Sequence, residues 1–103
     1  MSAARAGERS RPVALVTGAR QGIGLATAIR LAAEGFDVVA ADLSAEMDEA
    51  VSAIEGAGGA ARAQRMDVAD VEALPEAVAE AWGAFGRIDC LVNNAGLAMR
   101  PLT

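Results

Sequence analysis

The sequence predicts an α/β fold, a doubly wound parallel sheet with helices on both faces. Two observations predict it: short apolar runs alternate along the chain with longer segments of helical periodicity, and the connections between them are short. Right-handed crossovers then place the strands in the order 3-2-1-4, which is half of a doubly wound sheet. We expect residues 1–11 to form a flexible, soluble tail and residues 12–103 to form the fold.

The first half of the chain carries the clearest elements. Residues 12–17 form an apolar run that starts with Pro12, which a strand tolerates at its first position. Residues 22–34 are apolar around most of a helix circumference, and Gly35 stands where a left-handed helix cap belongs. Residues 37–42 are a nearly continuous apolar run, which is typical of a buried strand in a parallel sheet.

A second helix and a third strand follow. Ser44 is a good N-cap for the helix, and its inward stripe at i, i+4 and i+7 consists of Met47, Val51 and Ile54. Residues 60–66 form the third strand, which we expect at a sheet edge because it carries two arginines.

The last two elements are a helix and a strand. Asp70 is the predicted cap of the helix, and Pro75 falls near its first turn. The fourth strand is the apolar run 88–93. The apolar stripe of the helix consists of Val71, Leu74, Val78, Trp82 and Phe85.

Composition excludes several function classes. The chain has 103 residues and a net charge of −5, which argues against a protein that binds nucleic acid and against one that binds a membrane surface through a basic patch. No apolar run approaches the length of a membrane span, so we expect a cytoplasmic protein. Cys90 is the single cysteine and there is no histidine, so we predict neither an intrachain disulfide nor a metal site.

Three glycines at fixed offsets separate the first strand from the first helix. Gly18 lets the strand turn, Gly22 lets the backbone approach a pyrophosphate, and Gly24 lets the helix pack closely on the sheet. A helix N-terminus favours anions because its N–H groups lack partners and its dipole is positive there. The pattern therefore predicts a phosphate-binding turn.

Asp42 closes the second strand at a suitable distance from this turn. Its carboxylate can accept hydrogen bonds from both hydroxyls of an adenosine ribose and would repel a 2′-phosphate. Arg20, in the glycine turn, could instead partner a 2′-phosphate. We give Asp42 the greater weight, because charge repulsion at the hydroxyl itself is hard to offset. NAD is therefore the predicted cofactor, and NADP is the less favoured one.

These residues resemble the short-chain dehydrogenase/reductase superfamily of the classical type, with a Rossmann-type domain and a likeness to 3-oxoacyl-carrier-protein reductases. The resemblance extends from Pro12 onward, and Gln21, in place of the arginine common in NADP-preferring members, again favours NAD. It is carried by Thr17-Gly18-x-x-x-Gly22-x-Gly24, Asp67-Val68, Phe85-Gly86-Arg87-Ile88-Asp89 and Asn93-Asn94-Ala95-Gly96.

The resemblance implies a role for each matching position. The three glycines of the turn and Ile23 would line the pyrophosphate, and Asp42 would hold the adenosine ribose. Arg20 and Gln21, in the same turn, are also expected to be cofactor-binding residues. Asp67 and Val68 would contact the adenine, whereas Asn93 would either bridge strands or contact the cofactor. The ribose on the nicotinamide side would be held by Asn94, Ala95 and Gly96.

The resemblance also implies an activity, hydride transfer between nicotinamide and an alcohol or ketone, in a protein that forms homo-oligomers when complete. That chemistry needs a tyrosine, a lysine and a serine, yet the chain contains neither tyrosine nor lysine and has no serine after Asn94. We therefore predict no catalytic residue here and interpret the chain as the N-terminal, cofactor-binding half of an oxidoreductase, inactive alone. The alternatives are a stand-alone module that binds NAD or another adenine nucleotide, and a methyltransferase with a similar glycine-rich turn.

Overall fold

Four parallel strands form the sheet in the computed structural model of the chain, which describes residues 11–95. They are β1 (Val13–Thr17), β2 (Asp37–Asp42), β3 (Ala61–Arg65) and β4 (Cys90–Asn93). Their order is β3-β2-β1-β4, and every pairing is parallel. The predicted doubly wound sheet, its strand order and the edge position of the third strand are therefore confirmed.

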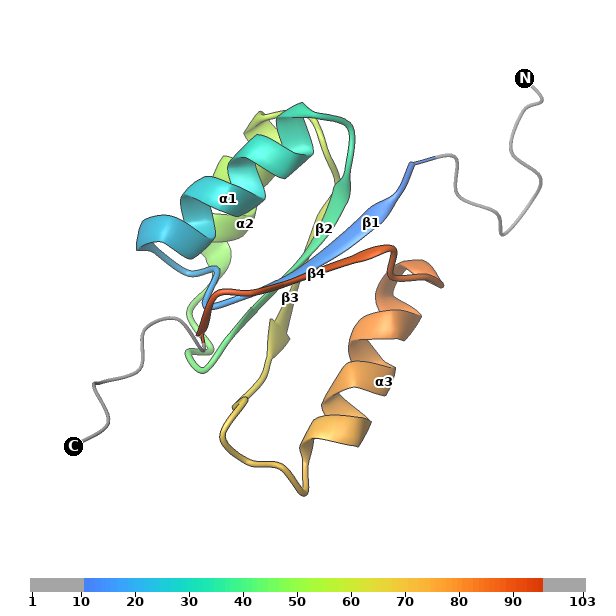
Figure 1. Ribbon diagram of the computed structural model, residues 1–103. Coiled ribbons are helices and arrows are strands. Elements are labelled where there is room, and N and C mark those ends of the chain that lie inside the picture. The colour runs from blue at the N-terminus through green and yellow to red at the C-terminus, as the bar shows by residue number, and fades with distance from the viewer. Residues whose placement is uncertain (1–10, 96–103) are drawn as a thin grey trace.

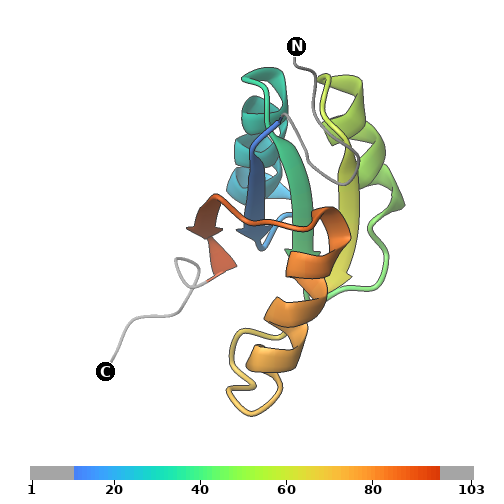
Figure 2. The ribbon, with the colours of Figure 1, turned by 90° about the vertical axis from the view of Figure 1, so that its right-hand side faces the viewer.

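Helices cover both faces of this sheet. α1 (Gly22–Ala33) and α2 (Asp48–Gly56) lie on one face, and α3 (Leu74–Phe85) lies on the other (Figure 1). In the turned view, α3 stands in front of the strands while α1 and α2 stand behind them (Figure 2). Right-handed crossovers require this distribution. No helix within residues 11–95 is both long and apolar enough to cross a membrane.

The core has two parts because successive side chains of a strand point to opposite faces. Along β2, Val38 and Ala40 pack in the cluster beneath α1 and α2. Val39 and Ala41 pack in the cluster beneath α3. All four side chains are fully buried, as expected for a central strand of a parallel sheet.

Both predicted helix N-caps are wrong. The Ser44 hydroxyl accepts the N–H of Glu46 at 3.0 Å within a loop, and α2 begins only at Asp48, after the buried side chain of Met47 has entered the core. Asp70 likewise accepts the N–H of Ala73 at 3.3 Å in a turn before α3. That helix starts at Leu74 because the proline that follows, which lacks an N–H, is best accommodated in a first turn.

The predicted inward stripe of α3 is only partly correct. Phe85 is buried, but the helix faces the sheet mainly through Ala81 and its small neighbours, which let the helix backbone come close to the strands. Leu74 also packs against this cluster, whereas three members of the stripe are exposed. Val71, which precedes the helix, is exposed by 71%, and Val78 and Trp82 are exposed by 40% and 50%.

Asp37 closes the amino end of the sheet, opposite to the end that the glycine turn occupies. Its side chain is 1% exposed and lies 3.0 Å from Nε of Arg11. The same carboxylate oxygen accepts the N–H of Ala60 at 2.9 Å. Arg11 also donates to the carbonyl oxygen of Phe36 at 3.1 Å. The start of β2 is therefore held both by Arg11, before β1, and by Ala60, before β3.

Asp89 has a similar role at the start of β4. Its carboxylate accepts the N–H of Val13 at 2.8 Å and two bonds from the guanidinium of Arg87 at 2.8 and 2.7 Å. The hydrogen bonds from Arg87 and then from the Val13 backbone lower the pKa of Asp89 below its ordinary value of 3.8. This carboxylate therefore stays charged and binds the first residue of β1.

Candidate functional site

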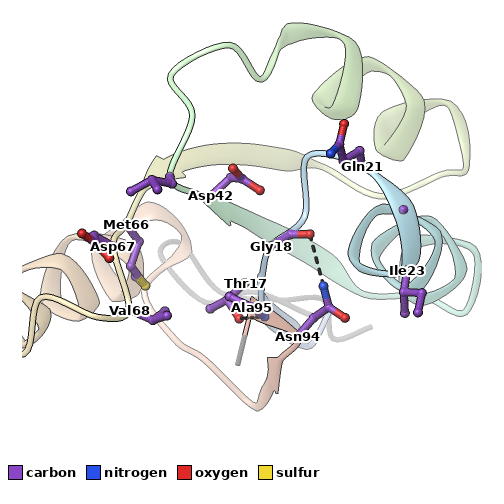
Figure 3. Close-up of a pocket in the computed structure, with 12 residues that line it drawn as sticks. Thr17, Gly18, Gln21, Ile23, Asp42, Met66, Asp67, Val68, Asn94 and Ala95 are labelled. Carbon is purple, nitrogen blue, oxygen red and sulfur yellow. Dashed lines mark hydrogen bonds between the residues drawn. The ribbon is translucent and has the colours of Figure 1, made fainter. Parts of the chain in front are cut away.

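A hollow of about 530 Å³ lies at the carboxyl ends of the strands (Figure 3). In open parallel sheets, ligands bind at this end, where the connections leave the sheet in opposite directions. Segments from all four strands contribute to it. The lining residues are Thr17, Gly18, Gln21, Gly22, Ile23, Asp42, Leu43, Met66, Asp67, Val68, Asn94 and Ala95.

The glycine turn opens the amino end of α1 toward this hollow. Gly18 and Gly22 have φ values of 65° and 63°, a left-handed conformation that side chains with a Cβ rarely adopt. Gln21, the N-cap residue, makes no side-chain cap, and the first turn of α1 carries no acidic residue. The first turns of α2 and α3 both carry acids. None of the three helices has a side-chain cap, so α1 is distinguished by the absence of an acidic residue that would repel an anion from its first N–H groups.

Gly24 has a packing role and does not line the hollow. A Cβ at this position would collide with the carbonyl oxygen of Gly18 and with Nδ2 of Asn94. Asn94 donates from Nδ2 to that carbonyl oxygen at 3.4 Å, which is the dashed bond in Figure 3. Only a residue without a side chain lets the helix, the turn and the segment after β4 meet this closely.

Thr17 connects the ends of β1 and β4. Its hydroxyl donates to Oδ1 of Asn93 at 3.0 Å and accepts the backbone N–H of Ala95 at 3.0 Å. The Thr17 side chain is 4% exposed, so both bonds are shielded from water. Asn93 thus acts as a bridge between strands in this structure, while Asn94 and Ala95 face the hollow.

Asp42 ends β2 with its carboxylate at the hollow. One oxygen accepts the N–H of Arg20 at 3.1 Å, and the other accepts the N–H of Ser44 at 3.0 Å. These bonds orient the carboxylate. An ionised carboxylate has about four acceptor positions, so about two remain for a ligand. Among residues 11–95, no ion pair engages Asp42.

A largely apolar wall completes the hollow on the side of β3. Met66 is 6% exposed and Val68 is half-buried, while Leu43 is 57% exposed and reaches the hollow from the loop after β2. Asp67 is exposed and accepts the N–H of Ala69 at 2.9 Å, which fixes the turn after β3. Apolar side chains beside a carboxylate suit the flat face and polar edge of a purine.

Most of the residues predicted from the sequence meet at this hollow. Arg20 is the main departure: it lines an adjacent hollow of about 280 Å³ together with Asp42 and Ser44. Gly96 lies outside the described residues. Sequence reasoning assigned no role in the site to Thr17, Leu43 or Met66. Thr17 is the first residue of the glycine motif and Met66 directly precedes Asp67-Val68, so their positions in and beside these motifs were the available signal. No sequence signal marked Leu43.

Comparison with known proteins gives a consistent picture. The model of the short chain dehydrogenase family matches residues 12–103. The Short-chain reductase protein NovJ of Streptomyces niveus is 55% identical over 86 residues, covering 82% of this chain and 33% of that protein. The 3-oxoacyl-[acyl-carrier-protein] reductase FabG of Thermotoga maritima is 43% identical over 91 residues, covering 87% and 37%.

Solved structures agree with these relatives. A 3-oxoacyl-[acyl-carrier protein] reductase from Brucella melitensis, crystallised in complex with NAD, superposes with a TM-score of 0.81 at 42% identity. The alignment covers 91% of this chain and 40% of the Brucella chain. The present chain thus spans only about a third of the length of the curated relatives named above.

Proposed function

The chain belongs to the short chain dehydrogenase family, and on that premise we propose that it is the cofactor-binding part of an NAD-dependent oxidoreductase. The reaction is hydride transfer between nicotinamide and an alcohol or ketone, with the catalytic groups supplied by polypeptide that this sequence does not include. The relatives are proteins of about two and a half times its length, which supports this assignment. We further propose a cytoplasmic homo-oligomer as the complete protein.

One observation carries the proposal: a single hollow joins the open amino end of α1 to the carboxylate of Asp42. An uncapped helix end without acids attracts the negative charge of a pyrophosphate. Asp42 keeps acceptor positions for two neighbouring hydroxyls of a ribose. The wall of Leu43, Met66 and Val68 would then take the adenine, with Asn94 and Ala95 near the second ribose.

The choice of NAD over NADP rests on Asp42. A 2′-phosphate would bring about two negative charges beside a carboxylate that no cation pairs with among residues 11–95. The Arg20 guanidinium, which lines an adjacent hollow with Asp42, donates to the carbonyl oxygen of Glu46 and to Oε1 of Gln21. Neither bond goes to the carboxylate, so the charge of Asp42 is not paired by Arg20, which supports discrimination against the phosphate.

The experiment is a titration of the 103-residue chain with NAD, NADP and S-adenosylmethionine, followed by the fluorescence of Trp82, the single tryptophan. We expect saturable binding of NAD, weaker binding of NADP and none of S-adenosylmethionine. Asp42→Ala should weaken NAD relative to NADP by roughly 1.5–3 kcal/mol, because a charged hydrogen-bond acceptor is lost. An unchanged ratio of the affinities for NAD and NADP would show that Asp42 does not bind the ribose.

A second function, a stand-alone nucleotide-binding module without catalysis, is favoured by one observation. The chain contains no tyrosine, no lysine and no histidine, the residues that most often move protons in such chemistry. The intact mass of the native polypeptide separates the two functions. A mass near 10.4 kDa would favour the module, whereas a mass about two and a half times larger would favour the cofactor-binding part of an oxidoreductase.

A further inference from the structure

We propose that Arg20 is a positioning residue for the adenosine end of the site. The inference rests on the proposed function, since it assigns Arg20 the task of holding the wall that an adenosine would contact. One residue of that wall, Leu43, belongs to the loop of residues 43–47, which connects β2 to α2. The guanidinium of Arg20 ties this loop to the glycine turn.

The side chain of Arg20 makes two hydrogen bonds with neutral oxygens. Nε donates to the carbonyl oxygen of Glu46 at 3.3 Å, and Nη1 donates to Oε1 of Gln21 at 3.2 Å. The planar guanidinium can donate in both directions at once, which an ammonium group cannot do in the same geometry. Arg20 therefore joins the middle of the loop to the residue that begins α1.

The loop has an anchor at each end and needs one between them. At its start, the N–H of Ser44 is held by Asp42, and at its end the side chain of Met47 is 3% exposed in the core. Leu43, which precedes Ser44, projects toward the hollow and is 57% exposed, so core packing does little to hold it. Between the two anchors lie Ala45 and Glu46, and the bond from Arg20 to Glu46 links this stretch to the glycine turn.

The main chain of Arg20 acts at the same place. Its N–H donates to Asp42 at 3.1 Å, and the preceding Ala19 N–H donates to the carbonyl oxygen of Ala41 at 3.0 Å. Arg20 therefore contacts both parts of the adenosine end, the loop through its side chain and the Asp42 carboxylate through its main chain. Ordering a loosened loop on binding costs free energy, which lowers the apparent affinity for the ligand.

The test compares Arg20→Ala and Arg20→Lys with Arg30→Ala in the 103-residue chain. Arg30 is a matched control, because it lies on the exposed side of α1 and pairs only locally with Glu34 at 2.8 Å. Amide hydrogen exchange in residues 43–47, without ligand, measures how well the loop is ordered, and a titration measures the affinity for NAD. Arg20→Ala should accelerate exchange severalfold and raise the Kd for NAD about 3–10-fold, as expected for loss of one hydrogen bond. Arg20→Lys should restore only part of the protection from exchange and part of the affinity for NAD, and Arg30→Ala should change neither quantity.

Two results overturn the proposal. Exchange in Arg20→Ala that equals exchange in Arg30→Ala shows that Arg20 does not hold the loop, whatever happens to affinity. Full recovery of affinity in Arg20→Lys, with loop exchange unchanged in both Arg20 variants, assigns the effect to charge alone. If the unmodified chain binds no NAD, the proposed function fails, while the exchange measurement still decides the role of Arg20 independently.

Discussion

The two ends of β2 carry the same residue type in opposite circumstances. Asp37 opens the strand with its side chain 1% exposed, paired with Arg11 and bonded to the N–H of Ala60. Asp42 closes the strand at a hollow, bonded to two backbone N–H groups and to no cation among the residues described. One carboxylate has a compensating charge beside it, and the other is left available.

The difference shows how a parallel sheet separates stability from binding. At the amino end, connections are closed by carboxylates that satisfy backbone donors, as both Asp37 and Asp89 do. At the carboxyl end, the chain departs on both faces and leaves a space, so polar groups there are oriented by the backbone but not neutralised. A charge that keeps free acceptor positions is suited to a ligand.

The largest expected effect comes from the same substitution at the two ends. Asp37→Ala should lower the free energy of unfolding by about 3 kcal/mol, because it removes a buried carboxylate and leaves a partly buried guanidinium and the N–H of Ala60 without their acceptor. Asp42→Ala should cost only about 1 kcal/mol, since Asp42 is only half-buried and its loss leaves no charged partner behind. Urea unfolding at one protein concentration measures both. Equal losses of unfolding free energy would show that Asp37 and Asp42 contribute alike to stability, contrary to this account.

A smaller effect is expected at the junction of β1 and β4. Thr17→Val keeps the shape of the side chain but removes the hydroxyl that joins Asn93 to the N–H of Ala95. We expect a loss of about 1 kcal/mol in the free energy of unfolding and a severalfold weaker affinity for NAD. Thr27→Val, in the middle of α1, is the control for the substitution itself. Unfolding that is unchanged in Thr17→Val would mean that the hydroxyl does not join the strands.

The smallest effect concerns the pH dependence at the amino end. Because the folded pKa of Asp89 is below 3.8, its stabilising contribution is fully present above the unfolded pKa and is lost as the pH falls through the folded value. The difference in unfolding midpoint between the unmodified chain and Asp89→Asn should therefore be constant above about pH 5 and shrink below the unfolded pKa. A difference that grows on acidification would contradict this sign.

Sequence reasoning was most successful where one local rule decides the structure. The alternation of buried strands and helices predicted the sheet and its order, and Gly35 has the left-handed φ of 111° expected of a helix end. Gly18, Gly22 and Asp42 were predicted to share a site because strands of one direction end at the same edge, and they do line one hollow.

It failed where distant contacts override local propensity. Ser44 and Asp70 have good capping side chains, but the burial of Met47 and the restricted backbone of Pro75 decide where α2 and α3 begin. The exposure of Trp82 was missed for a similar reason: periodicity shows that a helix has an apolar side but not which neighbours cover it. The contact of Arg20 with Glu46 depends on the path of a loop, which no motif records.

The most direct measurement is a titration of the ¹⁵N-labelled chain with NAD, followed residue by residue in amide NMR spectra. The account predicts saturable shifts at the carboxyl end of the sheet, at Gly18, Gly22 and Ala95 and in the loop after Asp42. It predicts constant signals at the amino end, at Val13 and Ala60. No saturable shifts, or shifts centred on the amino end, would contradict the claim that the carboxyl end of this sheet is an NAD site.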